Sequence, residues 1–154
     1  MKLLIVTTEL GLDGGGMSLS CTKLADVLSR KHTVEIADST AQPILTASGG
    51  ALAHLRHSIG MEYKLKMEVE KYKDYDAVIG FGGNCNGYYS SLLAHKINAN
   101  YVLSFRGSDI NLSKWSAETD WYSHKAIDKA DKIVVLSNEM KNNVLHVSPS
   151  AKNT

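Results

Sequence analysis

The chain has 154 residues, of which 44% are hydrophobic and 21% charged, a composition that excludes a disordered or fibrous protein and fits one domain with one sizeable core. Lys and Arg number 17 against 16 Asp and Glu, so the net charge of +1 gives no broad cationic surface for nucleic acid or an anionic membrane. No segment approaches the ~20 apolar residues that span a bilayer, and the apolar start at 3–6 is shorter than a signal-peptide core.

These limits predict a cytoplasmic protein, with peripheral association with the inner face of the membrane as the alternative. Cys21 and Cys85 lie far apart and outside any zinc-ligand spacing. We therefore expect two reduced thiols, no metal site and no disulfide framework.

Short apolar runs recur along the chain, separated by segments with helical periodicity. Four of the runs are typical of strands buried on both faces, namely residues 3–6, 77–81, 102–105 and 133–136. A fifth run, 33–37, alternates more and is expected nearer an edge of the sheet. Amphipathic segments that favour crossover helices lie at 17–30, 88–97 and 119–130. This alternation predicts an α/β fold, a Rossmann-like, doubly wound, mostly parallel sheet with helices on both faces.

The segment from 39 to 73 is less regular. Residues 63–69 alternate like a strand, yet Leu65, Val69 and Tyr72 share one helix face among good helix formers, so we expect a helix. Ser137 directly follows the last strand and is placed to cap a short helix over 139–144. The expected domain covers 1–147, and 148–154 is a tail or the start of an interdomain linker.

Ligands of open α/β sheets bind beyond the carboxyl ends of the strands, so the segments that follow strands are candidate sites. The first of these ends in Gly14, Gly15 and Gly16 directly before a helix, where successive N–H groups can hold a phosphate. A merely flexible turn is the alternative. The second, residues 80–87, offers Asn84 and Asn86 for sugar hydroxyls, with helix capping as the alternative.

The third segment places Arg106, Ser108 and Asp109 at the end of a central strand. An arginine suits phosphate or carboxylate, and Asp109 can orient a hydroxyl or act as a base. A mutual pair of Arg106 and Asp109 that only shapes the loop is the alternative. Farther along, Trp115, Trp121 and Tyr122 are aromatic residues for which core or lid packing is favoured over stacking on a ligand.

A dinucleotide-dependent oxidoreductase is a weaker reading of the glycines. Asp38 ends the second strand about 20 residues after them, where a ribose-binding acid would stand. However, Leu19 occupies the position of that motif's third glycine, and the preceding loop is longer than its tight turn. A phosphate loop of the Walker type is excluded, because Met17 and Ser18 follow Gly16 where it needs Lys and Ser or Thr.

Taken in order and spacing, these segments resemble the N-terminal domain of the retaining GT-B glycosyltransferases of family 4. The residues that carry the resemblance are 2–7, 14–16, 24–28, 32–36, 75–80, 104–111 and 130–137. Such enzymes have two Rossmann-like domains, with the acceptor mainly on the N-terminal one and the nucleotide-sugar donor mainly on the C-terminal one. The resemblance thus implies one half of a GT-B fold, with the donor-binding domain absent from this chain.

By that resemblance, the chain is the acceptor-side domain of an enzyme that transfers a sugar from a nucleotide-sugar to a glycan or other acceptor, without a cofactor or metal, and is inactive alone. The implied donor diphosphate-binding residues are Gly14, Gly15 and Gly16. The implied catalytic residues are Arg106 and Asp109, and the implied acceptor-binding residues are Asn84, Asn86 and Ser108. The family often has a histidine just after the strand at 77–81, where this chain has Gly82-Gly83-Asn84. The alternative is a non-catalytic binding or scaffold domain that pairs with a separate donor-binding subunit.

Overall fold

The computed structural model describes residues 1–7, 15–38, 51–111, 117–149 and 151. One sheet of five strands forms the centre, with β1 (Lys2–Thr7), β2 (Thr33–Asp38), β3 (Ala77–Phe81), β4 (Asn100–Ser104) and β5 (Lys132–Val134). The strand order is β2-β1-β3-β4-β5, and every neighbouring pair is parallel. The predicted α/β fold is confirmed, and the more alternating strand, β2, lies at an edge.

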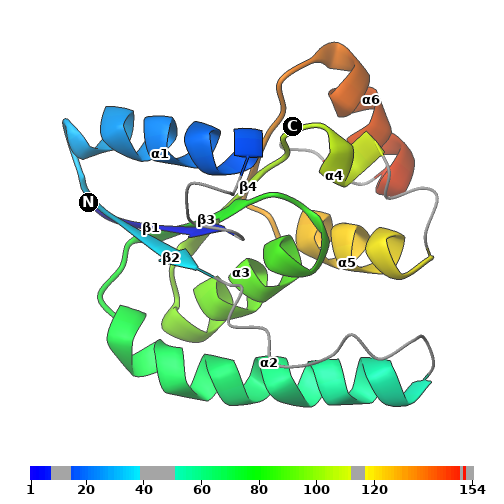
Figure 1. Cartoon of the computed structure of the whole chain (residues 1–154), viewed down its shortest axis with the longest axis horizontal. Helices are drawn as coiled ribbons and strands as arrows, with labels where there is room; N and C mark the ends of the chain where they lie inside the picture. Colours follow the sequence, from blue (N-terminus) through cyan, green and yellow to red (C-terminus); the bar gives the residue numbers. More distant parts are fainter. Residues whose placement is uncertain (8–14, 39–50, 112–116, 150, 152–154) are drawn as a thin grey trace.

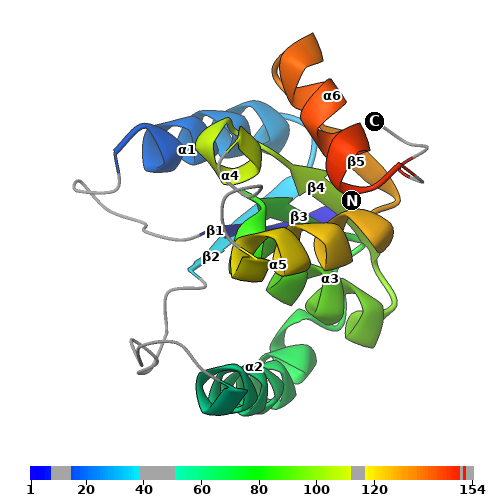
Figure 2. The same cartoon turned by 90° about the vertical axis from the view of Figure 1, so that its right-hand side faces the viewer.

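Helices cover both faces of this sheet (Figure 1). They are α1 (Gly15–Ser29), α2 (Ala51–Tyr72), α3 (Asn84–Ile97), α4 (Ser108–Asn111), α5 (Ala117–Asp128) and α6 (Asn138–Val147). Figure 2 shows α1 on one side of the sheet and α2, α3 and α5 on the other. Within the described parts of the chain, no helix is long and apolar enough to cross a bilayer.

Two hydrophobic clusters, one on each face of the sheet, explain why the strands are continuously apolar. Leu4 and Val6 of β1 belong to the larger cluster, which includes residues of α3 and α5. Ile5, between them, packs with Cys21 and Ala25 of α1 in the smaller cluster. Because successive side chains of a strand point to opposite faces, a strand covered on both faces needs apolar residues at every position.

The observed boundaries differ from the predicted ones where polar residues begin a helix. α3 begins at Asn84 and not at residue 88. Residues 84–87, which were predicted as loop, are therefore the first turn of a helix. The short helix α4 lies in what was predicted as loop. The helix expected within 39–73 is confirmed as α2, in which Leu65 and Tyr72 are buried.

Ser137 caps α6 as predicted. Its backbone is extended, and its Oγ accepts a hydrogen bond of 3.2 Å from the backbone N–H of Met140. We expect Ser137→Ala to lower the free energy of unfolding by about 1 kcal/mol, measured by urea denaturation. The matched control is Ser29→Ala, because the exposed Ser29 hydroxyl only donates to the carbonyl of Asp26. Equal losses in the two variants would contradict a specific capping role.

Acid stability depends on Glu35 of β2. The Tyr75 hydroxyl donates a hydrogen bond to Glu35 and Lys71 Nζ lies 3.0 Å from Glu35 Oε1, and these contacts, the tyrosine first, hold the pKa of Glu35 below its ordinary value. Their contribution is therefore present above the unfolded pKa of about 4.3 and is lost as pH falls through the lower folded pKa. Tyr75→Phe should flatten the loss of stability below about pH 4. Urea denaturation from neutral to acid pH measures this, with Tyr63→Phe, whose ring is exposed, as the control.

Candidate functional site

The segments predicted as sites meet where the parallel strands end, which we call the carboxyl end of the sheet. There β1 ends at Thr7, β3 at Phe81 and β4 at Ser104. The strand order places the switch point of the sheet between β1 and β3, because the chain adds β2 on one side of β1 and β3 on the other. The carboxyl end of β1 and β3 is therefore the expected position of a ligand.

Asn86 joins the two strands at that switch point. It is buried, and its Nδ2 donates to the carbonyls of Val6 (3.1 Å) and Phe81 (2.9 Å). Since both partners are acceptors, the amide nitrogen must face them and the amide oxygen must face away. That Oδ1 is buried and has no hydrogen-bond partner among the residues that the structure describes.

Unsatisfied buried polar atoms gather at the carboxyl end. Among the described residues, six buried side-chain atoms lack a hydrogen-bond partner, and four of them belong to Asn84, Asn86, Ser104 and Arg106. An unpaired buried polar group costs ~1–3 kcal/mol, so a cluster of them needs an explanation such as a binding or catalytic role. The other two atoms belong to His32 and Ser123.

The backbone at this end also adopts unusual conformations. Gly15, Gly82 and Gly107 have φ of +58°, +104° and +134°, which a side chain would oppose. Asn84 has φ of +48° although it is not a glycine. Such strain persists only where surrounding contacts impose it, and it is frequent at ligand sites.

Asp109 connects the loops that follow β3 and β4. Its carboxylate is 6% exposed and accepts backbone N–H groups from Gly83 (2.9 Å), Gly107 (2.8 Å), Ile110 (3.2 Å) and Arg106, the last at 3.0 and 3.1 Å from the two oxygens. Four amide groups therefore share one carboxylate. This arrangement fixes both loops and leaves the aspartate tied to the backbone.

Gly83 is required by packing at the same place. A Cβ added to it would lie 2.4 Å from Cε1 of Phe105, whose ring is fully buried. The absence of a side chain lets the β3–α3 loop lie against that ring and brings the Gly83 N–H to Asp109. A Cβ on the neighbouring Gly82 would be 3.8 Å from Sδ of Met17, so the first turn of α1 is close by.

Arg106 lies over the aromatic face of Phe81, with Cζ 4.0 Å from the ring centroid. Burial lowers the pKa of the guanidinium, while the charges of Cys21 and Asp109 oppose that shift. Burial also raises the pKa of the Cys21 thiol, an effect that a hydrogen bond with Thr7 and the charge of Arg106 partly offset. The cation is thus held on the α1 side of the sheet, in surroundings that disfavour its charge.

The structure brings most of the predicted site residues to this one end. Gly15 and Gly16 are the first residues of α1, and a Cβ on either would meet no atom of the described residues within 4 Å. Asn84 and Asn86 lie in the first turn of α3, and the Arg106 and Asp109 loop contacts it. Gly14 and Trp115, and the side chains of Asp38 and Ser108, lie outside what the structure describes.

Several residues that support the site were not predicted from the sequence. Nothing in the sequence indicates that the guanidinium of Arg106 stacks on Phe81. Nor does the sequence indicate that Cys21 of α1 interacts electrostatically with Arg106. The link from Asp109 to Gly83 was also missed, although paired glycines after a strand were a usable signal of close packing. Among the described residues, no group of three or more His, Cys, Asp or Glu side chains is placed to hold a metal ion.

An aromatic cluster lies between α3 and α5. The ring centroids of Tyr88, Trp121 and Tyr122 are 5.0 to 5.6 Å apart. Tyr122 is buried, whereas Trp121 remains 47% exposed. The cluster thus packs the two helices together, as the favoured sequence interpretation expected for Tyr122.

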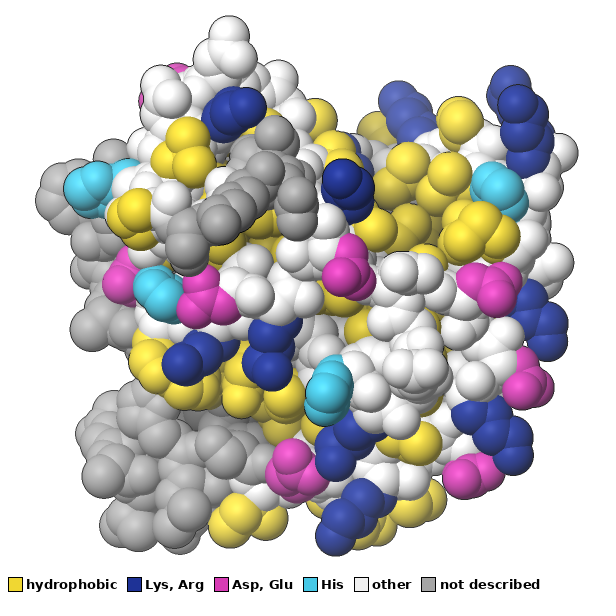
Figure 3. Space-filling model, turned by 180° about the vertical axis from the view of Figure 1, so that it is seen from behind, with side chains coloured by type: hydrophobic (Ala, Val, Ile, Leu, Met, Phe, Trp, Pro, Cys, Tyr) yellow, Lys and Arg dark blue, Asp and Glu magenta, His cyan; other side chains and the backbone are white. Residues whose placement is uncertain are grey.

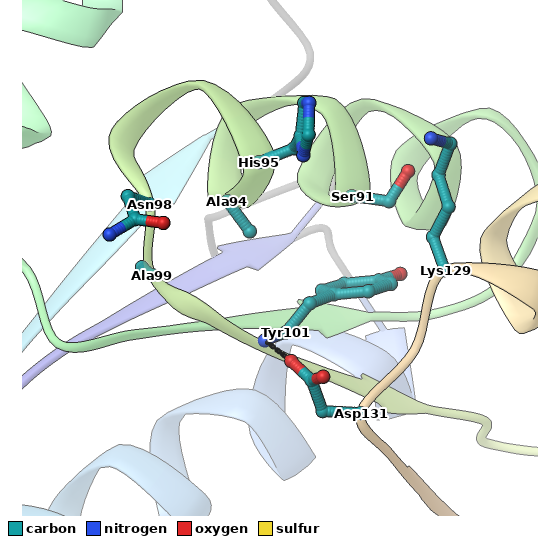
Figure 4. Close-up of a pocket in the computed structure, with 8 residues that line it drawn as sticks. All are labelled: Ser91, Ala94, His95, Asn98, Ala99, Tyr101, Lys129 and Asp131. Atoms are coloured by element: carbon teal, nitrogen blue, oxygen red, sulfur yellow. Dashed lines mark hydrogen bonds between the residues drawn. The ribbon is translucent and has the colours of Figure 1, made fainter.

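A separate pocket of about 240 Å³ lies at the opposite, amino end of the sheet. Figure 4 shows its lining, which includes Ser91, His95 and Lys129, and a hydrogen bond of 2.7 Å from the N–H of Tyr101 to Asp131. The Tyr101 hydroxyl donates to the carbonyl of Gly87, so the ring is fixed. None of the six unsatisfied atoms belongs to this lining. The carboxyl end therefore remains the better candidate site.

The sequence matches no protein-family model and no curated protein sequence. Solved structures do match. One is from Listeria monocytogenes and is assigned as UDP-N-acetylglucosamine 2-epimerase, with a TM-score of 0.61 and 14% identity over 97% of this chain and 43% of that one. Another is UDP-GlcNAc 2-epimerase from Methanocaldococcus jannaschii, with a TM-score of 0.55 and 16% identity over 95% and 42% of the two chains.

This likeness shows the fold alone. The chain spans less than half the length of the solved structures that it matches. Its five-stranded sheet corresponds to one Rossmann-like half of a GT-B-like fold. The fold predicted by the resemblance is thereby confirmed, whereas family 4 and sugar transfer stay predictions.

Proposed function

We propose that this chain is one domain of an enzyme that acts on nucleotide-sugars, specifically the acceptor-side domain of a retaining glycosyltransferase. The observation that carries the proposal is the gathering of unsatisfied polar atoms at the carboxyl end, beside the switch point of a GT-B-like half. Two structurally similar proteins are named as enzymes that act on a nucleotide-sugar, and this supports the same class of substrate for this chain.

In this proposal, different residues at the carboxyl end contact different parts of the substrates. Gly15 and Gly16, at the start of α1, face the donor diphosphate together with Gly14. Asn84 and Asn86 turn toward acceptor hydroxyls when the first turn of α3 adjusts to the ligand, because a hydroxyl would satisfy their free oxygens. The geometry favours a positioning role for Asp109, because backbone amides occupy its carboxylate. The cleft then needs a second wall, supplied by further sequence or by another chain.

An apolar surface supports the need for that further wall or partner. Hydrophobic side chains gather at the upper right of Figure 3, which shows the molecule from behind the view of Figure 1. The exposed large hydrophobic side chains include Val27 of α1, which is 57% exposed, and Val134 of β5, which is 45% exposed. Parallel sheets are normally covered on both faces, so these residues favour contact with another domain or subunit. The same surface suits the alternative, a scaffold domain that recruits a separate donor-binding subunit.

The proposal is tested on the protein at its native length, whose intact mass is measured first. That protein is incubated with UDP-N-acetylglucosamine, and the products are analysed by NMR and mass spectrometry. Release of UDP with transfer of the sugar to an acceptor is the expected result. Formation of a C2 epimer without transfer of the sugar would indicate that the enzyme is an epimerase and not a glycosyltransferase. No reaction with any nucleotide-sugar, by a protein that ends at Thr154 and has no partner, would contradict both.

A further inference from the structure

The positive charge of Arg106 has no matching partner among the described side chains. None of their carboxylates forms an ion pair with it, and its Nε has no hydrogen-bond partner. Asp109 lies nearby in the same loop, yet both of its oxygens accept backbone N–H groups. The guanidinium of Arg106 thus stacks on the ring of Phe81, and the nearby carboxylate of Asp109 binds backbone amides.

Backbone donors lie near the loop that carries this cation. α3 begins next to Gly83, and no described side chain caps its N-terminus. The first N–H groups of a helix have no partner within the helix, and the helix dipole adds partial positive charge there. The Arg106 loop reaches this turn through Asp109, which accepts the N–H of Gly83. The Arg106 side chain and the N-terminus of α3 are therefore two sources of positive potential at the carboxyl end, and Arg106 carries a full charge.

We propose that Arg106 binds a phosphate group of the substrate at the carboxyl end of the sheet, beside the first turn of α3. The proposal rests on the proposed function, because nucleotide-sugar chemistry supplies phosphate either as the donor diphosphate or on a phosphorylated acceptor. A planar guanidinium offers several N–H donors in a fork that matches phosphate oxygens, and stacking on Phe81 orients that fork. The carboxylate of Asp109 keeps the loop in place and, although its charge favours the charged arginine, it forms no ion pair with the guanidinium.

The test is an NMR titration of the 154-residue chain with inorganic phosphate, glucose 1-phosphate, UDP and acetate. Phosphate compounds should shift the Arg106 guanidinium resonance and the amide resonances of 83–86. Arg106→Gln should weaken phosphate binding at least about tenfold, and Arg106→Lys, which keeps the charge without the fork, should bind between the two. Arg30→Gln is the matched control, because Arg30 is an exposed cation just beyond the end of α1.

The outcomes separate the sources and the two proposals. Tighter binding of UDP than of glucose 1-phosphate identifies the donor diphosphate, and the reverse identifies a phosphorylated acceptor. Equal binding of acetate and phosphate, or unchanged phosphate binding in a folded Arg106→Gln, would overturn the phosphate site. Phosphate binding at Arg106 in a protein whose native-length form leaves every nucleotide-sugar unchanged would keep this site and remove the proposed function.

Discussion

Replacement of Asp109 by alanine should destabilise the chain by about 3–5 kcal/mol, the largest effect that we expect from one polar substitution. The carboxylate is the shared acceptor of four backbone N–H groups from two loops. Alanine removes that acceptor and leaves buried amides such as that of Gly83 without a partner. Since native domains are stable by only ~5–15 kcal/mol, urea denaturation should show a large fall in the midpoint.

Two further variants make this result specific. Asp109→Asn keeps one oxygen but presents an NH2 group to some of the donors, so an intermediate loss of about 2 kcal/mol is expected. Asp26→Ala, at an exposed position of α1, should change the free energy of unfolding by less than about 0.5 kcal/mol. A midpoint of Asp109→Ala equal to that of Asp26→Ala would show that Asp109 does not hold the loops, and a directly catalytic role would then be favoured.

Gly83→Ala should be the most damaging small substitution, with a loss of about 3 kcal/mol. The new Cβ would lie 2.4 Å from Cε1 and 3.1 Å from Cδ1 of Phe105, a ring that the core encloses completely. To relieve the contact, either the ring or the β3–α3 loop must move, and the loop carries the hydrogen bond to Asp109. Thermal and urea denaturation measure the loss.

Gly16→Ala is the matched control for Gly83→Ala. A Cβ on Gly16 meets no atom within 4 Å in the described part of the chain, and Gly16 lies within α1. The free energy of unfolding of Gly16→Ala should therefore be unchanged or higher by up to about 1 kcal/mol. Phe105→Leu should partly rescue Gly83→Ala, so that the double variant loses less than the sum of the single ones. Additive losses would show that the ring is not the obstacle.

The arrangement of the sheet was predictable because burial on both faces leaves a strong sequence signal. Ala77–Phe81, for example, is a continuous apolar run and is strand β3 at the residues predicted. The start of α3 was not predictable in the same way, because its first turn contains Asn84, Asn86 and Gly87, which are more typical of loops. There a backbone with positive φ and the packing against Phe105 determine the structure, and both depend on contacts that are distant in sequence.

The candidate site was predictable in position but not in its internal contacts. Residues that follow parallel strands must meet at one end of the sheet, and this rule placed Asn86, Arg106 and Asp109 together. The choice between a free carboxylate and one bound by amides depends on loop geometry that no local pattern records. The sequence left open a side-chain pair of Arg106 and Asp109. In the structure, backbone amides donate hydrogen bonds to Asp109 instead.

If the proposed function is correct, the ligand binds at the carboxyl end of the sheet. We would map the backbone amide shifts of the 154-residue chain during titration with UDP-N-acetylglucosamine at millimolar concentration. A ligand at the carboxyl end should shift the amide resonances of Gly16, Gly82, Gly83 and Arg106. Shifts confined to the amino-end pocket, at Ser91 and Asp131, would contradict it.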